Sequence, residues 1–348
     1  MEVVMNTVER VEVVLPGKVE PEALEIRYGQ LVPAPAAGQV LIGMEATGVS
    51  FAEQQMRRGR YYDQPPFPFV PGYDLVGSVL AVGEGVGREL LGTRVAALTK
   101  TGGWASHVVL DAADLIEVPA GVGAAEAETA VVNGITAWQM LHRKARVRAG
   151  RTVLVHGANG GVGSVLVQLA LGAGVRVIGT ASARHHAALR ALGVSPVDYR
   201  GGDIPARVRE LAPDGVDAVF DHVGGRSVID SWQLLAPGGT LVSYGSAATR
   251  DDEGSGQWPV LKLLCRVWLW NWLPNGRRAY FFNVWAGRAF SKNRFRSRLR
   301  TDLTQVFTAL QRGEITARIA AEIPLARAGE ALRLAESGTV AGKVVLVP

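Results

Sequence analysis

A glycine-rich turn holds the residues whose types and spacing most strongly indicate chemistry. In TVLVHGANGGVGSVLVQLALGAGV, residues 152–175, Ala158, Gly160 and Gly163 follow the pattern A-x-G-x-x-G between two apolar runs. Glycine at the second position lets the backbone approach a phosphate, and glycine at the third lets a helix pack closely on a strand. A helix that starts here directs free N–H groups at an anion. The pattern therefore predicts a dinucleotide pyrophosphate site rather than a purely structural turn, formed by Ala158, Asn159, Gly160, Gly161, Val162 and Gly163.

The residues at the end of the next apolar run indicate which dinucleotide fits. NAD-binding folds place an Asp or Glu about 20 residues after the glycines, on the ribose 2′-hydroxyl. This chain has TASARHH there, residues 180–186, which contains no acid. A 2′-phosphate needs hydrogen-bond donors and positive charge. We therefore predict NADP(H), with Ser182 and Arg184 at the phosphate and Thr180 and Tyr199 beside it. The alternative is that Arg184 only faces solvent.

Two further loops are expected to complete the cofactor site. Each follows a Val-rich run that reads as a strand, and ligands bind at the carboxyl ends of parallel strands. The predicted residues are His222, Val223, Gly224, Tyr244, Gly245 and Ser246.

These loops need a parallel sheet to position them, and the second part of the chain has the pattern of one. Apolar runs alternate with amphipathic runs, as strands joined by helices require. The predicted strands are Thr152–His156, Val175–Thr180, Ala218–Asp221 and Thr240–Tyr244. A helix from about Glu126 precedes them, with an apolar face of Ala130, Val131, Ile135, Trp138 and Leu141.

The first part of the chain reads as β-rich. Short Val-rich runs recur between Gly and Pro, which is typical of a barrel or sandwich. The tail from Thr301 is expected to return to this domain, with helices Asp302–Arg312 and Ala326–Glu336 and a final strand Lys343–Val347. We predict an α/β fold in two domains: a β-rich domain of residues 1–128 and 300–348, and a doubly wound, parallel-sheet domain of residues 129–299.

Composition limits the classes of protein to consider. The chain has 348 residues, a formal net charge of +5 and one cysteine, Cys265. A single cysteine excludes an intrachain disulfide and a cysteine-rich zinc site. The N-terminus is charged where a signal peptide needs an apolar core, and no apolar run reaches membrane-spanning length. These features predict a cytoplasmic protein.

Residues 258–300 differ from the rest of the chain. They hold five of the eight tryptophans, ten Lys or Arg residues and no Asp or Glu. A basic aromatic stretch of this kind suits a membrane surface or, less well, nucleic acid. The alternative is an interdomain or dimer surface, where Trp and Arg are also favoured. We expect no nucleic-acid partner, because no recognised nucleic-acid motif accompanies the stretch.

Several motifs in order resemble one enzyme family. They are PGYDLVGSV (71–79), VGEGV (82–86), VVNGITAWQML (131–141), VHGANGGVG (155–163), GTAS (179–182), FDHVGG (220–225) and GKVVLVP (342–348). The chain resembles the zinc-independent quinone oxidoreductases of the medium-chain dehydrogenase/reductase superfamily, and among them the vesicle amine transport protein-like reductases. The resemblance implies a GroES-like catalytic domain and a Rossmann domain with the active site in the cleft between them. It also implies a homodimer.

The resemblance further implies the reaction and some of its residues. The usual reaction is hydride transfer from NADPH to a quinone or an α,β-unsaturated carbonyl. Ser50 stands where the family usually has Asn, Gln55 where many members have Tyr, and Tyr61 matches a second tyrosine; we predict these three as catalytic. Asn133 and Thr136 lie three residues apart on a helix that abuts the nicotinamide in the family. Lys343 matches a near-terminal Gly-Lys and is predicted to reach the cofactor.

The zinc enzymes of the same superfamily are the main rival. They carry a cysteine near position 50, a Gly-His-Glu motif and a four-cysteine lobe, whereas this chain has Ser50, Gly72-Tyr73-Asp74 and one cysteine. Neither zinc site is possible with these residues, so we predict no metal.

Two functions follow as hypotheses. The first is an NADPH-dependent reductase of a quinone or an enone, with a hydrophobic substrate. The second is a cofactor-loaded membrane-surface or protein-interaction module that uses residues 258–300.

Overall fold

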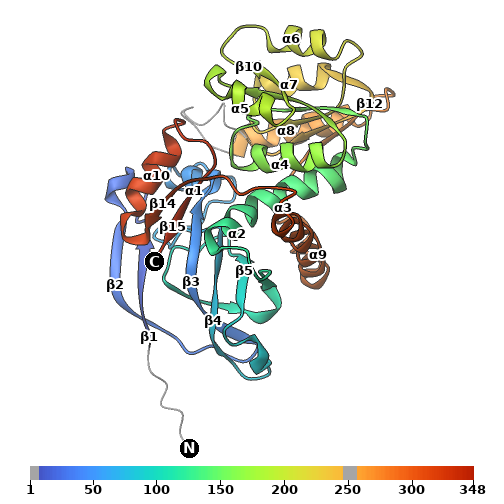
Figure 1. Cartoon of the computed structure of the whole chain (residues 1–348). Helices are drawn as coiled ribbons and strands as arrows, with labels where there is room; N and C mark the ends of the chain where they lie inside the picture. Colours follow the sequence, from blue (N-terminus) through green and yellow to red (C-terminus); the bar gives the residue numbers. More distant parts are fainter. Residues whose placement is uncertain (1–7, 246–256) are drawn as a thin grey trace, which may run out of the picture. The chain divides into compact units, whose positions relative to one another are not determined.

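The computed structural model describes residues 8–245 and 257–348, without the side chains of 257–260. The chain forms two compact units: unit 1 is Met1–Val132 with Ser291–Pro348, and unit 2 is Asn133–Phe290 (Figure 1). The predicted boundaries were 128/129 and 299/300. The second boundary moves because helix α9 (Lys292–Gln311) begins earlier than the predicted Asp302, capped by the Ser291 hydroxyl. Its first turns form ion pairs with unit 1.

Unit 2 is a doubly wound α/β domain, as predicted. The six strands that the structure describes in this unit are all parallel and lie in the order β10-β9-β8-β11-β12-β13. With β8 taken as the first strand, this is the order 3-2-1-4-5-6 of a dinucleotide-binding fold. The order in which strands are added to the sheet reverses between β8 and β11. The strands are β8 (Thr152–Val155), β9 (Arg176–Ala181), β10 (Ser195–Asp198), β11 (Val216–Asp221), β12 (Leu235–Ser243) and β13 (Arg278–Phe281).

Helical elements lie before and between these strands, and several of them bury apolar residues. They are η4 (Gln139–Ala145), α4 (Gly161–Gly172), η5 (Ala183–His185), α5 (His186–Ala191), α6 (Ile204–Leu211), α7 (Arg226–Gln233) and α8 (Gln257–Trp270). The hydrophobic core contains side chains of the Val-rich strands and Trp232 of α7. The Trp232 ring stacks on that of Trp270 of α8 at a centroid distance of 4.6 Å. Strands β10 and β13 were not predicted. Each has only four residues, and their sequences SPVD and RAYF lack a continuous apolar run.

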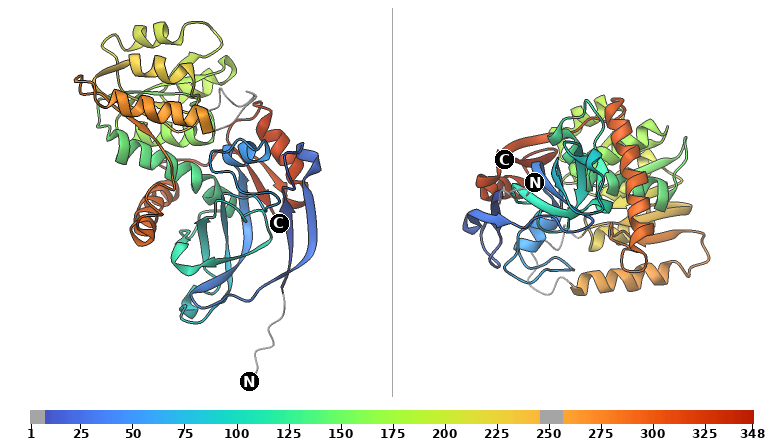
Figure 2. Two further views of the ribbon diagram at one scale, coloured as in Figure 1. Left: turned by 180° about the vertical axis from the view of Figure 1, so that it is seen from behind. Right: turned by 90° about the horizontal axis from the view of Figure 1, so that it is seen from below.

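Unit 1 is β-rich, again as predicted. One sheet has the strand order β14-β15-β3-β4-β5-β7, with β6 also paired to β3, and a second sheet joins β1 and β2. The C-terminal strands lie beside β3, so the tail returns to the first domain (Figure 2). The strands are β1 (Val8–Val14), β2 (Glu25–Val32), β3 (Gln39–Val49), β4 (Asp74–Val82), β5 (Arg94–Leu98), β6 (His107–Asp111), β7 (Ile116–Glu117), β14 (Ile319–Pro324) and β15 (Lys343–Val347).

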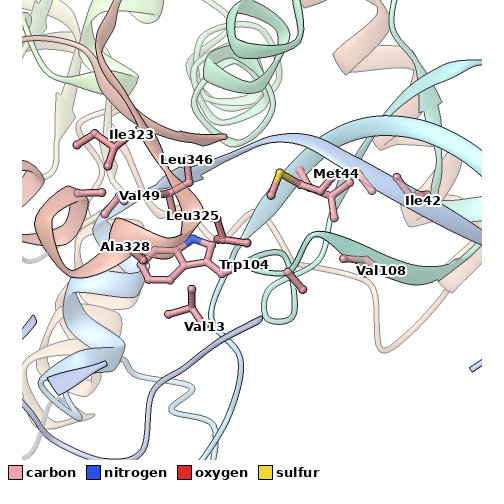
Figure 3. Close-up of a cluster of buried hydrophobic side chains, with 14 of the residues drawn as sticks. Val13, Ile42, Met44, Val49, Trp104, Val108, Ile323, Leu325, Ala328 and Leu346 are labelled. Atoms are coloured by element: carbon pink, nitrogen blue, oxygen red, sulfur yellow. The ribbon is translucent and has the colours of Figure 1, made fainter. Parts of the chain in front are cut away.

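The core of unit 1 forms around one tryptophan. Trp104 is fully buried among aliphatic side chains from both ends of the chain, including Val49 of β3 and Leu346 of β15 (Figure 3). Its indole N–H donates to the Gly48 carbonyl at 3.0 Å, so the polar edge of the ring is satisfied. The helical elements of this unit are η1 (Pro21–Ala23), α1 (Phe51–Arg57), η2 (Arg88–Leu90), η3 (Ala112–Asp114), α2 (Ala124–Ala130), η7 (Leu325–Arg327) and α10 (Ala328–Glu336), besides α9.

The continuous helix predicted from Glu126 is interrupted. Helix α2 ends at Ala130, α3 spans Val132–Trp138, and a π-helical turn, η4, follows. The break falls where the Asp74 carboxylate accepts the backbone N–H of Val132 at 2.9 Å. A side chain from a distant strand thus starts a new helix, which helical periodicity alone does not predict.

Candidate functional site

The glycine-rich turn of unit 2 has the geometry of an anion cradle. It joins β8 to α4, and Gly157 adopts a φ of +64°, a conformation that favours glycine. The Gly160 N–H donates to the Gly157 carbonyl at 2.9 Å, and the Ala158 N–H donates to the Thr180 carbonyl at 3.0 Å. Helix α4 starts immediately afterwards, so its first N–H groups have no partner within the helix and are available to an anion.

Two glycines of this turn make close approaches to other atoms. A Cβ on Gly163 would lie 2.1 Å from the Gly157 carbonyl oxygen, so helix α4 packs against the backbone of the turn at this glycine. A Cβ on Gly161 would lie 2.7 Å from Nδ2 of Asn133, so the structure brings Asn133 of α3 against the turn. Thr136 is buried on the same helix. The turn therefore fits a nicotinamide dinucleotide by its backbone shape and its helix N-terminus.

One other predicted residue of unit 2, His222, meets the same turn, and Gly245 and Tyr244 lie against His222. The imidazole of His222 packs on Gly157, where a Cβ would lie 2.4 Å from its Cε1, and Gly245 packs on the His222 backbone. The Tyr244 ring lies 5.9 Å from the His222 ring. Burial lowers the pKa of His222, although Asp221 opposes the shift, and burial raises the pKa of Tyr244. Ser246 lies outside the described residues.

The loop after β11 is held by a buried carboxylate. Asp221 is fully buried, and its Oδ1 accepts the N–H groups of Val223 at 2.8 Å and Gly224 at 2.9 Å. The sequence placed these two residues at the site, but the carboxylate that shapes their loop was not predicted as a site residue.

The residues predicted for the 2′-phosphate occupy the end of β9. Ser182 is buried directly after the strand, and its side chain makes no capping bond to η5. Arg184 is exposed two residues later, with its Nε 3.1 Å from the His185 ring. Tyr199 is exposed and lies under the Arg200 guanidinium. The arrangement leaves Arg184 accessible to an anionic ligand.

Thr180 forms hydrogen bonds within the protein. It is 2% exposed, and its hydroxyl bonds the Gly157 N–H at 3.1 Å and Nδ1 of His156 at 3.3 Å. The Thr180 hydroxyl therefore holds the turn, and its predicted place at the cofactor stays a prediction.

Unit 1 gathers a separate group of hydroxyls around a buried acid. Glu53 accepts the N–H of Tyr73 at 2.6 Å and that of Ser50 at 2.8 Å, and also accepts the Ser50 hydroxyl. The Tyr73 hydroxyl lies 2.8 Å from the Tyr61 hydroxyl. Burial raises the pKa of Glu53 and of Tyr61, so Tyr61 keeps its proton at neutral pH. The Tyr61 hydroxyl is thus protonated and lies within hydrogen-bond distance of Tyr73, and its catalytic role stays a prediction.

The other two predicted catalytic residues, Ser50 and Gln55, lie at the start of helix α1 and within it. Ser50 is the N-cap of α1, and with Glu53 it forms a capping box. The motif S-x-x-E was visible in the sequence and accounts for Ser50 without catalysis. Gln55 is 5% exposed on the same helix, and its Nε2 is buried without a hydrogen-bond partner. The catalytic roles of Ser50 and Gln55 stay predictions.

Lys343 lies in a buried ionic cluster, not at the surface. Its Nζ is 2.9 Å from Oδ2 of Asp74 and 2.5 Å from Oε1 of Glu128, and all three residues are buried. Burial lowers the pKa of Lys343, but the two carboxylates outweigh it and raise the pKa; burial raises the pKa of Glu128 well above its usual range. Because the ammonium already has acceptors within unit 1, this geometry favours a structural role for Lys343 over contact with a cofactor.

The predicted Trp- and Arg-rich segment is divided between the two units. In unit 1, Arg296 pairs with Asp111 and Asp114. In unit 2, Arg277 donates to backbone carbonyls that include Ala236 and Trp232. Much of the basic charge is therefore committed to the protein itself. No helix in residues 8–245 or 257–348 is both long and apolar enough to cross a membrane.

Two family models match the chain. One describes an alcohol dehydrogenase GroES-like domain and covers residues 36–120; the other describes a zinc-binding dehydrogenase and covers residues 192–346. The synaptic vesicle membrane protein VAT-1 homolog of Rattus norvegicus is 35% identical over 326 residues, which span 91% of this chain and 78% of the rat protein.

Solved structures agree with these matches. A mycobacterial protein complexed with NADPH is 29% identical, with a TM-score of 0.81 over 97% of this chain and 100% of that one. A quinone oxidoreductase of Pseudomonas syringae is 27% identical, with a TM-score of 0.83 over 97% of this chain and 100% of that one.

The donor set does not fit the zinc that one matched model has in its description. Zinc sites of this kind need Cys or His ligands. By the resemblance described above, Ser50 and Tyr73 correspond to ligand positions of the zinc enzymes, and Cys265 is exposed on α8 of unit 2. Within the two described ranges, no three His, Cys, Asp or Glu side chains are grouped closely enough to hold a metal ion.

Proposed function

Because the chain belongs to the medium-chain dehydrogenase/reductase superfamily, with VAT-1 homologues and quinone oxidoreductases among its relatives, we propose that it is an NADPH-dependent, zinc-independent reductase of quinones or α,β-unsaturated carbonyls. The observation that carries the proposal is the glycine cradle of unit 2. The residues that follow strand β9 include no Asp or Glu but do include an exposed arginine, Arg184. The NADPH complex of a mycobacterial relative supports the choice of cofactor.

Each unit has its own role in this proposal. When bound, NADPH supplies the hydride. The N-terminus of α4 and the backbone of the glycine turn hold the pyrophosphate, and Arg184 with Ser182 holds the 2′-phosphate. In unit 1, the Tyr61 hydroxyl donates a hydrogen bond or a proton to the substrate oxygen, with Tyr73 fixing its orientation. We also propose a cytoplasmic location, because the thiol of Cys265 is free and exposed.

Turnover tests the function directly. Purified protein should oxidise NADPH when a quinone such as 1,4-benzoquinone or an enone such as 2-cyclohexenone is added, and a parallel assay with added zinc should give no gain. A broad panel of both substrate classes without turnover would contradict the proposal, whereas zinc-dependent alcohol oxidation would move the chain to the rival class.

The Arg184→Ala variant tests the choice of NADP(H). A charge-assisted hydrogen bond to a phosphate contributes about 1.5–3 kcal/mol, so the dissociation constant for NADPH should rise about ten- to hundredfold. NADH lacks the phosphate, so its affinity should not change. Arg190→Ala, which removes another exposed arginine on α5, is the matched control. Equal losses for NADPH and NADH would remove Arg184 from the phosphate site.

The Tyr61→Phe variant tests the proposed donor. Loss of the hydroxyl should lower kcat about ten- to hundredfold while the ring contacts persist. Tyr28→Phe, at an exposed tyrosine of the same unit, should leave kcat unchanged. Steady-state kinetics with one quinone and one enone measure both variants, and an unchanged kcat for Tyr61→Phe would assign Tyr61 to packing.

We also propose that the protein is a homodimer formed through unit 2. Six large apolar side chains on and just after α8 are exposed: Leu261, Leu264, Trp268, Leu269, Trp272 and Leu273. The opposite side of α8 packs on the core of unit 2. Beside it, β13 is the terminal strand of the described sheet, so one of its edges has no strand partner there. A second copy would cover both the apolar face and the free strand edge.

The oligomeric state tests this surface. Trp268→Glu places a charge in the apolar face and should convert dimer to monomer in light scattering coupled to gel filtration. Leu211→Glu, at an exposed leucine of α6, should remain dimeric. A monomeric wild-type protein would overturn the dimer. If that monomer floats with phosphatidylcholine–phosphatidylserine vesicles, the membrane-surface hypothesis takes its place.

A further inference from the structure

A chain of buried hydrogen bonds runs beneath the glycine turn of unit 2. It starts at the Gly157 N–H, which bonds the Thr180 hydroxyl at 3.1 Å, and continues from Thr180 to Nδ1 of His156 at 3.3 Å. Nε2 of His156 then lies 3.1 Å from the Ser231 hydroxyl, which lies 2.8 Å from Oδ2 of Asp221. The side chains come from β9, the end of β8, α7 and β11, and all four are at least nine-tenths buried.

Each hydrogen bond in this series has a defined donor and a defined acceptor. An ionised carboxylate only accepts, so the Ser231 hydroxyl donates to Asp221 and must accept from His156. His156 therefore carries its proton on Nε2, which leaves Nδ1 as an acceptor. The Thr180 hydroxyl donates to Nδ1 and accepts the Gly157 N–H. Burial lowers the pKa of His156, although Asp221 and Asp230 oppose the shift, which agrees with this neutral ring.

Asp221 lies at the end of this chain and also holds a second loop. Its Oδ2 accepts the hydroxyls of Ser227 and Ser231, while its Oδ1 accepts the N–H groups of Val223 and Gly224. Four donors fill the acceptor capacity of the carboxylate. One buried charge is thus connected both to the glycine turn and to the loop after β11. These are the two loops that flank the point where the strand order reverses.

We propose that His156, Ser231 and Asp221 are positioning residues that set the glycine turn and the loop after β11 for dinucleotide binding. None of them contacts the ligand: they act through the Thr180 hydroxyl and the backbone N–H groups of the two loops. The proposal rests on the proposed function for the identity of the ligand, NADPH, but the hydrogen-bond chain itself belongs to the free protein.

Two serines of α7 provide a matched pair for the test. Ser227 and Ser231 donate to the same oxygen of Asp221, at 2.7 and 2.8 Å, but only Ser231 also bonds His156. Ser231→Ala should therefore raise the dissociation constant for NADPH about three- to tenfold, with kcat changed less than twofold. Ser227→Ala should change either quantity less than twofold. Thr180→Val should match Ser231→Ala without adding to it, and Thr180→Ser should restore binding.

Amide hydrogen exchange in the free protein separates this inference from the proposed function. Ser231→Ala and Thr180→Val should speed exchange at Gly157, whereas Ser227→Ala should not. Equal exchange and equal NADPH affinity in the two serine variants would overturn the inference. If the wild-type protein does not bind NADPH, the proposed function fails. The exchange data still decide whether the chain of hydrogen bonds holds the glycine turn.

Discussion

Replacing Lys343 by methionine is expected to lower the free energy of unfolding by about 3–5 kcal/mol. The ammonium bonds both carboxylate oxygens of Asp74, at 3.1 and 2.9 Å, and Oε1 of Glu128 at 2.5 Å. All of these atoms belong to unit 1 and lie away from water. Methionine fills a similar volume but leaves the buried carboxyls of Asp74 and Glu128 without the ammonium that balances them.

The size of this loss comes from the orphaned charge rather than from the attraction alone. Removing one member of a buried pair costs far more than removing an exposed pair. Lys292→Met is the control, because Lys292 is 47% exposed and pairs with a partly exposed Asp111; its loss should cost less than about 1 kcal/mol. Adding Asp74→Asn to Lys343→Met should recover part of the stability. Urea denaturation measures all four proteins, and equal midpoints for both lysine variants would contradict the account.

The Gly163→Ala variant should weaken NADPH binding at least about tenfold and destabilise unit 2 by about 1–3 kcal/mol. The added Cβ would lie 2.1 Å from the Gly157 carbonyl oxygen and 2.9 Å from its carbon. Both are backbone atoms of the turn, so helix α4 must shift away from the strand to relieve the overlap. That shift moves the helix N-terminus that is proposed to face the pyrophosphate.

A second glycine of the same helix supplies the control. A Cβ on Gly172 would meet nothing within 4 Å. Gly172→Ala should therefore keep NADPH affinity and change stability by less than about 1 kcal/mol. Thermal unfolding and NADPH titration compare the two variants. An unaffected Gly163→Ala protein would show that this close approach is not needed for the cradle.

The sequence predicted the fold where local pattern determines structure. Val-rich runs bounded by glycine marked the central strands of unit 2, and the A-x-G-x-x-G spacing placed the turn correctly. Strands β10 and β13 were missed because their stability comes from neighbouring strands rather than from their own apolar content. The predicted single helix after Glu126 was wrong because Asp74, far along the chain, caps Val132 and starts a new helix.

The site was predicted less completely than the fold. Motif positions identified the backbone cradle, but the role of Lys343 depends on Asp74 and Glu128, which no sequence spacing connects to it. Tyr73 was missed because its hydroxyl meets Tyr61 only in the folded unit. The S-x-x-E spacing of Ser50 and Glu53 is a capping-box signal in the sequence itself, and the catalytic role of Ser50 stays a prediction.

Isothermal titration of the wild-type protein with NADPH, and then with NADH, tests the central claim most directly. One NADPH should bind per chain, at least about tenfold more tightly than NADH, because Arg184 and Ser182 meet the 2′-phosphate while the glycine turn holds the pyrophosphate of both. Absence of NADPH binding, or tighter binding of NADH, would contradict the account.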